Sequence, residues 1–300
     1  MSKPLTRFAT TKEIMTPEFM RLICTLDKIA SDYHLEDFSR LNQARYPWSV
    51  GLLSNPSFYA SRMWEYPFAI LSAELQPGMK CADIGCGMSP FTIYLKDIAE
   101  CNVAGVDPIK GRIDYRRFGV SRKFIKQTKL EIIEGKVEKI PVPSNSFDRV
   151  FCLSVIEHLP LSNAKEGMQE MARILKPGGR AIITVDVNMH SEISRPLDLI
   201  WDSGLSPLGE IDLRWPFHRF GIFNDGRQPA DVFGMTLIKD SYPVEAAYTE
   251  VKENTPVIES YLAPTLSKKN LLITKWHHRL SFLYDRLPDR FFRSNAPKIK

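Results

Sequence analysis

The feature that most constrains the fold is an alternation of short apolar runs with helix-like stretches, which begins at Met79. Strands that are buried on both faces appear as continuous apolar runs, and helical crossovers join parallel neighbours. We therefore expect an α/β fold with a doubly wound, mainly parallel sheet. The five strand candidates are KCADIG (80–85), NVAGVD (102–107), LEIIEG (130–135), DRVFCLSV (148–155) and RAIITVDV (180–187).

Residues 1–76 have a mostly helical pattern. Pro17 suits the first turn of a helix through residues 19–33, with Thr16 as its N-cap. A second helix is expected over residues 61–75, where Pro67 predicts a kink or a break.

Beyond residue 187 the regular alternation is lost. DVFGMTLIK (231–239) and NLLITKW (270–276) are candidates for two further strands, which would bring the sheet to seven. Long segments without strand pattern are usually functional, so we expect the aromatic-rich insert after the fifth strand to lie on the substrate side. The expected segments are a helical N-terminal extension or lid (1–76), the ligand-binding core (77–187), the insert (188–230), the last core strands (231–276) and a basic C-terminal tail (277–300).

Composition indicates a cytoplasmic protein. The N-terminus has no apolar core of signal-peptide length, and no apolar window of about 18 residues predicts a membrane-spanning helix. The five cysteines have no C-x-x-C spacing, so we expect reduced thiols and no metal site. The net charge is +5, and the basic cluster over residues 110–129 is interpreted as a solvated helix face rather than a nucleic-acid surface. The oligomeric state stays open.

A glycine loop follows the first predicted strand. Gly85 and Gly87 allow a tight turn and close approach to a ligand, and the next helix begins near Ser89-Pro90. Asp107 ends the second strand, where a carboxylate can accept both hydroxyls of a ribose. These features suit either a dinucleotide or S-adenosylmethionine. Pro90 stands where the dinucleotide fingerprint needs a third glycine, which counts against NAD.

Two later segments carry a family resemblance: EGKVEKIPVPSNSFDRVFCLSVIEHL (134–159) and LKPGGRAIITV (175–185). Together with DIGCG (83–87), they resemble the class I S-adenosylmethionine-dependent methyltransferases, in particular the type 11/25-like branch. The resemblance spans residues 79–187 and implies a Rossmann-like fold with S-adenosyl-L-methionine as cofactor.

The resemblance also implies roles for individual residues. Asp83 and the loop Gly85-Cys86-Gly87 are expected to contact the methionine portion of the cofactor, and Asp107 is expected to hold the ribose. Further contacts are expected from Pro108 at the adenine face, the Val137 backbone at the adenine edge, and Ser154 near the methionine amino group. Lys136 departs from the family pattern, which has an acid there, and a lysine cannot accept a hydrogen bond from adenine.

Histidines are the candidates for removing a proton from the acceptor, because their pKa lies near working pH. His158 follows the fourth strand, where it either acts as a base or only caps the loop. His190 follows the fifth strand, and His218 lies in the insert. Tyr59, Tyr66 and Trp215 are candidate substrate contacts, although aromatics at helical spacing also fit a core stripe.

The leading hypothesis is a methyltransferase that acts on an oxygen or nitrogen of a small molecule. The residues after the fourth strand, Ser154-Val155-Ile156-Glu157, do not match the Asn/Asp-Pro-Pro-Tyr pattern of amino-group DNA methyltransferases. Nucleic-acid partners are therefore not expected. Integral membrane association is not expected either, because no apolar window predicts a spanning helix. Two alternatives stay open: a catalytically silent binding or scaffold protein of the same fold, and an NAD-dependent oxidoreductase.

Overall fold

The computed structural model describes residues 5–35, 56–111, 119–187, 196–213 and 231–239. The described residues form one sheet of nine strands and a two-stranded ribbon, β4 (Lys110–Gly111) with β5 (Val120–Ser121). In spatial order, the path through the large sheet is β10 (Ile211–Asp212), β1 (Thr6–Phe8), β11 (Asp231–Ile238), β8 (Leu175–Val187), β7 (Phe147–Leu153), β2 (Lys80–Ile84), β3 (Asn102–Asp107) and β6 (Glu131–Glu134), and β9 (Ser206–Pro207) pairs with β11.

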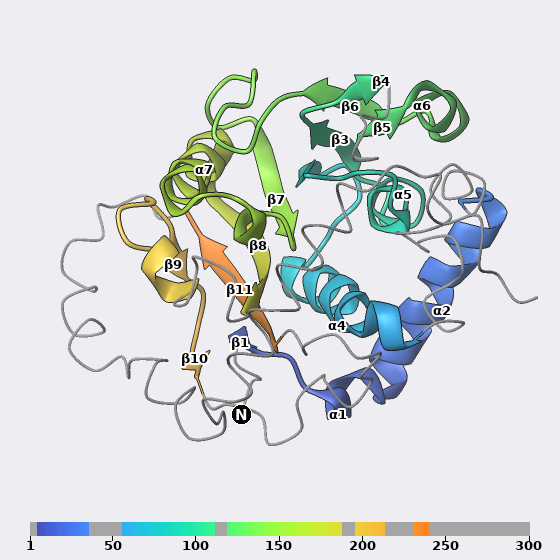
Figure 1. Ribbon diagram of the computed structural model, residues 1–300, viewed down its shortest axis with the longest axis horizontal. Helices are drawn as coiled ribbons and strands as arrows, with labels where there is room; N and C mark the ends of the chain where they lie inside the picture. Colours follow the sequence, from blue (N-terminus) through green and yellow to red (C-terminus); the bar gives the residue numbers. More distant parts are fainter. Residues whose placement is uncertain (1–4, 36–55, 112–118, 188–195, 214–230, 240–300) are drawn as a thin grey trace, which may run out of the picture. The chain divides into compact units, whose positions relative to one another are not determined.

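The five predicted central strands are confirmed, and all four pairings among them are parallel. Among these five strands, the chain begins in the middle with β2, moves outward to β3 and β6, and then returns to β7 and β8 on the other side (Figure 1). The direction of winding therefore reverses between β2 and β7. In doubly wound sheets, ligands bind at the carboxyl ends of the strands at this switch point.

Helices cover the two faces of the sheet (Figure 1). One apolar core contains buried side chains of α2 (Pro17–Asp32), α4 (Pro56–Ala73), α5 (Pro90–Asp97) and α6 (Arg122–Thr128). The other contains those of α7 (Leu161–Ile174) and of the short helix η3 (Pro196–Leu199). Two single-turn elements, α1 (Thr11–Ile14) and η2 (Ile156–His158), complete the described helices.

The N-terminal segment contributes a strand as well as helices. Thr16 caps α2 by accepting a hydrogen bond from Phe19 N, as predicted. The segment expected to be mostly helical also contains the strand β1, which pairs antiparallel with β11. The Phe8 ring of β1 contacts Phe233 edge to face, with ring centroids 4.8 Å apart. Only three residues form this strand, so its local pattern is too short to detect.

The region after β8 also extends the sheet. β9 pairs with residues 237–238 of β11, which lie beside the start of β8 and therefore opposite the carboxyl edge. The expectation that the whole insert 188–230 covers the substrate side is therefore wrong for Ser206–Pro207. β11 confirms the predicted strand at residues 231–239 and runs antiparallel to β8. The predicted strand at 270–276 and the tail 277–300 lie outside the described residues.

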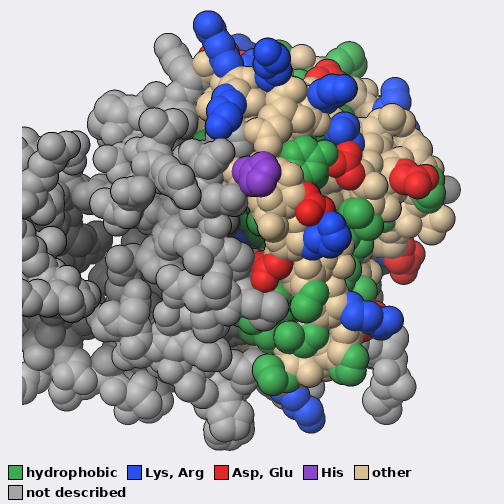
Figure 2. All heavy atoms as spheres, turned by 90° about the vertical axis from the view of Figure 1, so that its right-hand side faces the viewer, with side chains coloured by type: hydrophobic (Ala, Val, Ile, Leu, Met, Phe, Trp, Pro, Cys, Tyr) green, Lys and Arg blue, Asp and Glu red, His purple; other side chains and the backbone are tan. Residues whose placement is uncertain are grey.

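The basic cluster predicted over residues 110–129 is confirmed as an exposed helix face only at α6, because Lys110 lies in β4 and residues 112–118 lie outside the described ranges. Four basic side chains of α6 and its ends are exposed, namely Arg122, Lys123, Lys126 and Lys129, whereas Phe124 is buried. Figure 2 shows Lys and Arg side chains standing out at the upper end of the face that includes α6. Within the described ranges, no helix has the length and apolarity needed to cross a bilayer.

Candidate functional site

The glycine loop is tied to the end of the neighbouring strand. Gly85 and Gly87 have φ angles of +71° and +51°, which the absence of a Cβ permits. The backbone N–H groups of Gly85 and Cys86 donate to Val106 O at 2.8 and 3.2 Å. The loop therefore lies directly beside Asp107.

The loop also touches the segment that follows β7. A Cβ added to Gly85 would lie 2.5 Å from Val155 Cγ2, which is a steric clash, so glycine is required for this approach. A Cβ at Gly87 would meet no atom of the described residues within 4 Å. The loop thus packs against the protein at Gly85 and is open at Gly87, where a ligand could approach the backbone.

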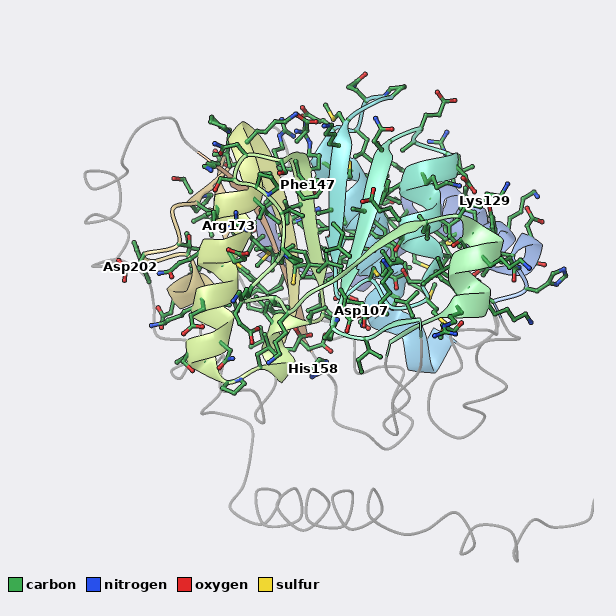
Figure 3. All side chains as sticks on the ribbon, turned by 90° about the horizontal axis from the view of Figure 1, so that it is seen from above. Asp107, Lys129, Phe147, His158, Arg173 and Asp202 are labelled. Atoms are coloured by element: carbon green, nitrogen blue, oxygen red, sulfur yellow. The ribbon has the colours of Figure 1, made fainter. Side chains whose placement is uncertain are left out.

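Asp107 is 6% exposed and is fixed in orientation. Its Oδ1 accepts a hydrogen bond from Ile109 N at 2.9 Å, which orders the turn containing the exposed Pro108. Figure 3 shows Asp107 and His158 at the same edge of the sheet, opposite Phe147 at the start of β7. The expected ribose-binding and acceptor-side residues therefore share one edge.

Asp83 is buried beneath the loop and accepts a hydrogen bond from Thr92 Oγ1 of α5. Burial raises the pKa of Asp83 to about 7; the hydrogen bond from Thr92 and the charge of Arg62 oppose this shift, and Asp107 adds to it. A cation bound nearby would favour the ionised carboxylate. The site therefore suits a ligand with a positively charged end.

Two predicted cofactor residues direct their side chains into the core. Cys86 packs against Gly105, where an added Cβ would lie 2.7 Å from its Sγ. Val137 packs in the same way against Gly167 of α7, where an added Cβ would lie 2.5 Å from Val137 Cγ1. Since these side chains fill packing spaces, only their backbone groups remain available to a ligand. Lys136 is exposed.

Glu65 is a site residue that the sequence analysis missed. It lies on α4 with no exposed surface, and its Oε1 accepts hydrogen bonds from Thr184 Oγ1 at 2.6 Å and from Ser154 Oγ. Ser154 has a φ of +50°, an uncommon conformation for a residue with a side chain. Glu65 therefore ties the N-terminal segment to the carboxyl ends of β7 and β8 and holds Ser154 in place.

Arg62, one turn before Glu65, forms an ion pair with it. Burial lowers the pKa of Arg62, but the charges of Glu65, Asp186 and Glu157 raise it by more. Glu157 is 7% exposed, and its Oε1 accepts a hydrogen bond from Asp186 N at 3.2 Å. An acid inside an apolar helix, with an arginine three residues earlier, is the signal that could have revealed the Arg62–Glu65 pair.

The acceptor-side candidates have different placements. His158 keeps solvent contact, while desolvation by surrounding atoms and the charge of Arg62 lower its pKa, which favours the neutral imidazole at pH 7. Tyr66 is buried and stacks on Phe91 with ring centroids 5.3 Å apart, so it belongs to the packing of α4 on α5. Three further candidates, His190, Trp215 and His218, lie outside the described residues, as does the side chain of Tyr59.

The chain is similar to known methyltransferases over part of its length. Residues 82–183 match the model of a family described as "Methyltransferase domain". The chain is 33% identical over 107 residues to a sterol 24-C-methyltransferase of Gibberella zeae, covering 35% of this chain and 27% of that protein. It is 25% identical over 158 residues to a tRNA U34 carboxymethyltransferase of a Geobacter species, covering 51% and 47% respectively. The chain thus spans less than half the length of these two curated relatives.

Solved structures give similar matches. The YcgJ protein of Bacillus subtilis aligns with a TM-score of 0.44 and 17% identity, over 59% of this chain and 99% of that one. A SAM-dependent methyltransferase from Aquifex aeolicus aligns with a TM-score of 0.44 and 16% identity, over 67% and 98%.

Proposed function

We propose that the protein is a class I S-adenosylmethionine-dependent methyltransferase that transfers the methyl group to an oxygen or nitrogen of a small molecule. The match of residues 82–183 to a family described as "Methyltransferase domain" supports this proposal. When bound, the cofactor supplies the methyl group on a positively charged sulfur. The rest of the chemistry is positioning of the acceptor and removal of its proton.

The observation that carries the proposal is the joint placement of the glycine loop and Asp107 at the switch point. The two hydrogen bonds from the loop to Val106 O hold the loop beside the carboxylate. We assign Asp107 to the ribose hydroxyls and the loop backbone from Gly85 to Gly87 to the methionine portion. Asp83 supports this assignment, because a buried carboxyl favours a positively charged ligand end.

The remaining cofactor contacts are assigned to backbone and small groups. We propose that Pro108 lies against the adenine, that the Val137 backbone reads the adenine edge, and that Ser154 lines the methionine end. The hydrogen bond from Ser154 Oγ to Glu65 supports a fixed position for this residue. His158 is a candidate proton acceptor, because its lowered pKa leaves the imidazole neutral at pH 7.

Binding calorimetry separates this function from its alternatives. We expect S-adenosylmethionine and S-adenosylhomocysteine to bind and NAD and NADH to give no heat beyond dilution. Release of S-adenosylhomocysteine in the presence of a panel of small amines and alcohols would then show turnover. Binding without turnover on any acceptor would favour a silent binding protein, and tight NAD binding without a response to either sulfur compound would contradict the proposal.

A further inference from the structure

Four charged side chains from three elements meet at the carboxyl edge. Arg62 and Glu65 come from α4, Glu157 from η2 and Asp186 from the end of β8, and the charges of the three acids all act on Arg62. We call this group the edge cluster. Within the described part of the chain, three carboxyls of this cluster act on one guanidinium.

One carboxyl oxygen of the edge cluster is unsatisfied. Glu157 Oε1 accepts the hydrogen bond from Asp186 N, whereas Glu157 Oε2 is buried and has no hydrogen-bond partner among the residues that the structure describes. Buried polar atoms are nearly always hydrogen-bonded in folded proteins, so an unsatisfied one calls for an explanation. A bound hydrogen-bond donor would supply the missing partner.

The edge cluster adjoins the glycine loop. Val155, two residues before Glu157, is the side chain that packs on Gly85. Ser154 is hydrogen-bonded to Glu65 of the cluster. Under the proposed function, this loop holds the methionine end of the cofactor, so the cluster lies on the side from which an acceptor would approach.

Resting on the proposed function, we propose that the acceptor is a cationic amine, that the edge cluster binds its ammonium group, and that Glu157 Oε2, rather than His158, takes its proton. An ammonium group would provide an N–H donor for Oε2 and a positive charge beside the three carboxyls. A neutral alcohol would provide a donor but no positive charge. The charge of the cluster therefore favours nitrogen over oxygen.

Burial and the charge of Asp186 raise the pKa of Glu157 well above its ordinary value, and a bound ammonium would lower it again, so that an ionised carboxylate faces the amine. The ammonium gives one proton to Glu157, and its nitrogen lone pair forms a bond to the methyl carbon. The carbon–sulfur bond breaks and its electron pair stays on sulfur. The methylated amine leaves, and Glu157 releases the proton to solvent.

Sinefungin tests the cluster without knowledge of the acceptor. In this analogue, a carbon that carries a protonated amine replaces the methylsulfonium, so a positive charge points towards the acceptor side. S-adenosylhomocysteine is uncharged at that position. We expect calorimetry on the full chain to show sinefungin binding at least about tenfold more tightly than S-adenosylhomocysteine, the usual order for a hydrogen bond between charged groups.

Variants identify the group responsible. Glu157→Gln should bring the affinities for sinefungin and S-adenosylhomocysteine to within about threefold of each other, because the amide removes the charge and the proton acceptor. The affinity for S-adenosylhomocysteine itself should stay unchanged. Glu166→Gln, an exposed position on α7, is the matched control and should keep the wild-type ratio. If Glu157→Gln does not fold, Asp186→Asn removes a neighbouring carboxyl of the same cluster and should also lower the ratio.

Two results would overturn the inference: equal affinity of the wild-type protein for the two compounds, or a sinefungin preference that survives in every folded cluster variant. Both leave the proposed function standing, since S-adenosylhomocysteine still binds. Failure of all three compounds, including S-adenosylmethionine, would instead contradict the proposed function itself.

Discussion

Thr184 donates a hydrogen bond to Glu65 across 119 residues of sequence, with 2.6 Å between Thr184 Oγ1 and Glu65 Oε1. Both side chains are fully buried. The contact joins α4, which precedes the glycine loop, to β8, whose carboxyl end lies at the edge of the proposed site. The N-terminal segment is therefore part of the site and not an appendage to the sheet.

Removing the Glu65 carboxyl should destabilise the protein. We expect Glu65→Ala to lower the free energy of unfolding by about 3–5 kcal/mol, because the ion pair with Arg62 is broken inside the protein and two hydroxyls lose their acceptor. Urea denaturation measures this value. Glu65→Gln keeps an acceptor oxygen and should lose less, and Glu166→Ala on the exposed face of α7 should change little. A loss below about 1 kcal/mol in Glu65→Ala would contradict the structural role.

The two glycines of the loop should differ in their tolerance of a methyl group. Gly85→Ala places a Cβ 2.5 Å from Val155 in a left-handed backbone, so we expect a loss of about 2–4 kcal/mol of stability from the clash and the strain. Gly87→Ala meets no described atom and should lose only about 1–2 kcal/mol of stability from its backbone conformation. Its affinity for S-adenosylhomocysteine should nevertheless fall, because the methyl group stands where the ligand approaches. Equal stability of the two variants would contradict this account.

Asp107→Ala should weaken cofactor binding by about 1.5–3 kcal/mol, the usual worth of hydrogen bonds to a charged group. The fold should survive because Asp107 is the last residue of its strand. Asp32→Ala, at an exposed position on α2, is the control and should bind normally. Unchanged affinity of Asp107→Ala for S-adenosylhomocysteine would mean that the ribose is held elsewhere.

The stability of the protein without ligand should carry a pH dependence from Asp83. Its pKa is about 7 in the folded protein and 3.8 for an ordinary aspartate, so the folded chain keeps this proton over an interval in which the unfolded chain releases it. The resulting stabilisation is complete below about pH 4 and is lost as the pH rises to about 7, with a slope of up to about 1.4 kcal/mol per pH unit.

Asp83→Asn should remove this contribution, since an amide does not titrate. The difference in unfolding free energy between wild type and variant should therefore shift in favour of the variant as the pH rises from 4 to 7. Urea denaturation at several pH values in this interval measures the shift. A difference that is constant with pH would show that the carboxyl is already ionised in the folded protein.

Sequence patterns predicted the parts of this structure that depend on local order. Strand β3 was predicted with its actual ends because its apolar run stops at Asp107, and α2 was predicted from the Thr16-Pro17 pair. The three-residue strand β1 could not be predicted, since it forms by pairing with β10 and β11, which are distant in sequence. Glu65 was missed for a related reason: its partners Ser154 and Thr184 are remote in sequence, and only the fold brings them together.

A crystal structure with S-adenosylhomocysteine bound tests the central claim most directly. We predict that the ribose hydroxyls lie within hydrogen-bond distance of the Asp107 carboxylate, that the methionine portion lies on the backbone from Gly85 to Gly87, and that the sulfur faces Glu157. Ligand density at any other place on the chain, or a ribose that does not contact Asp107, would contradict the account.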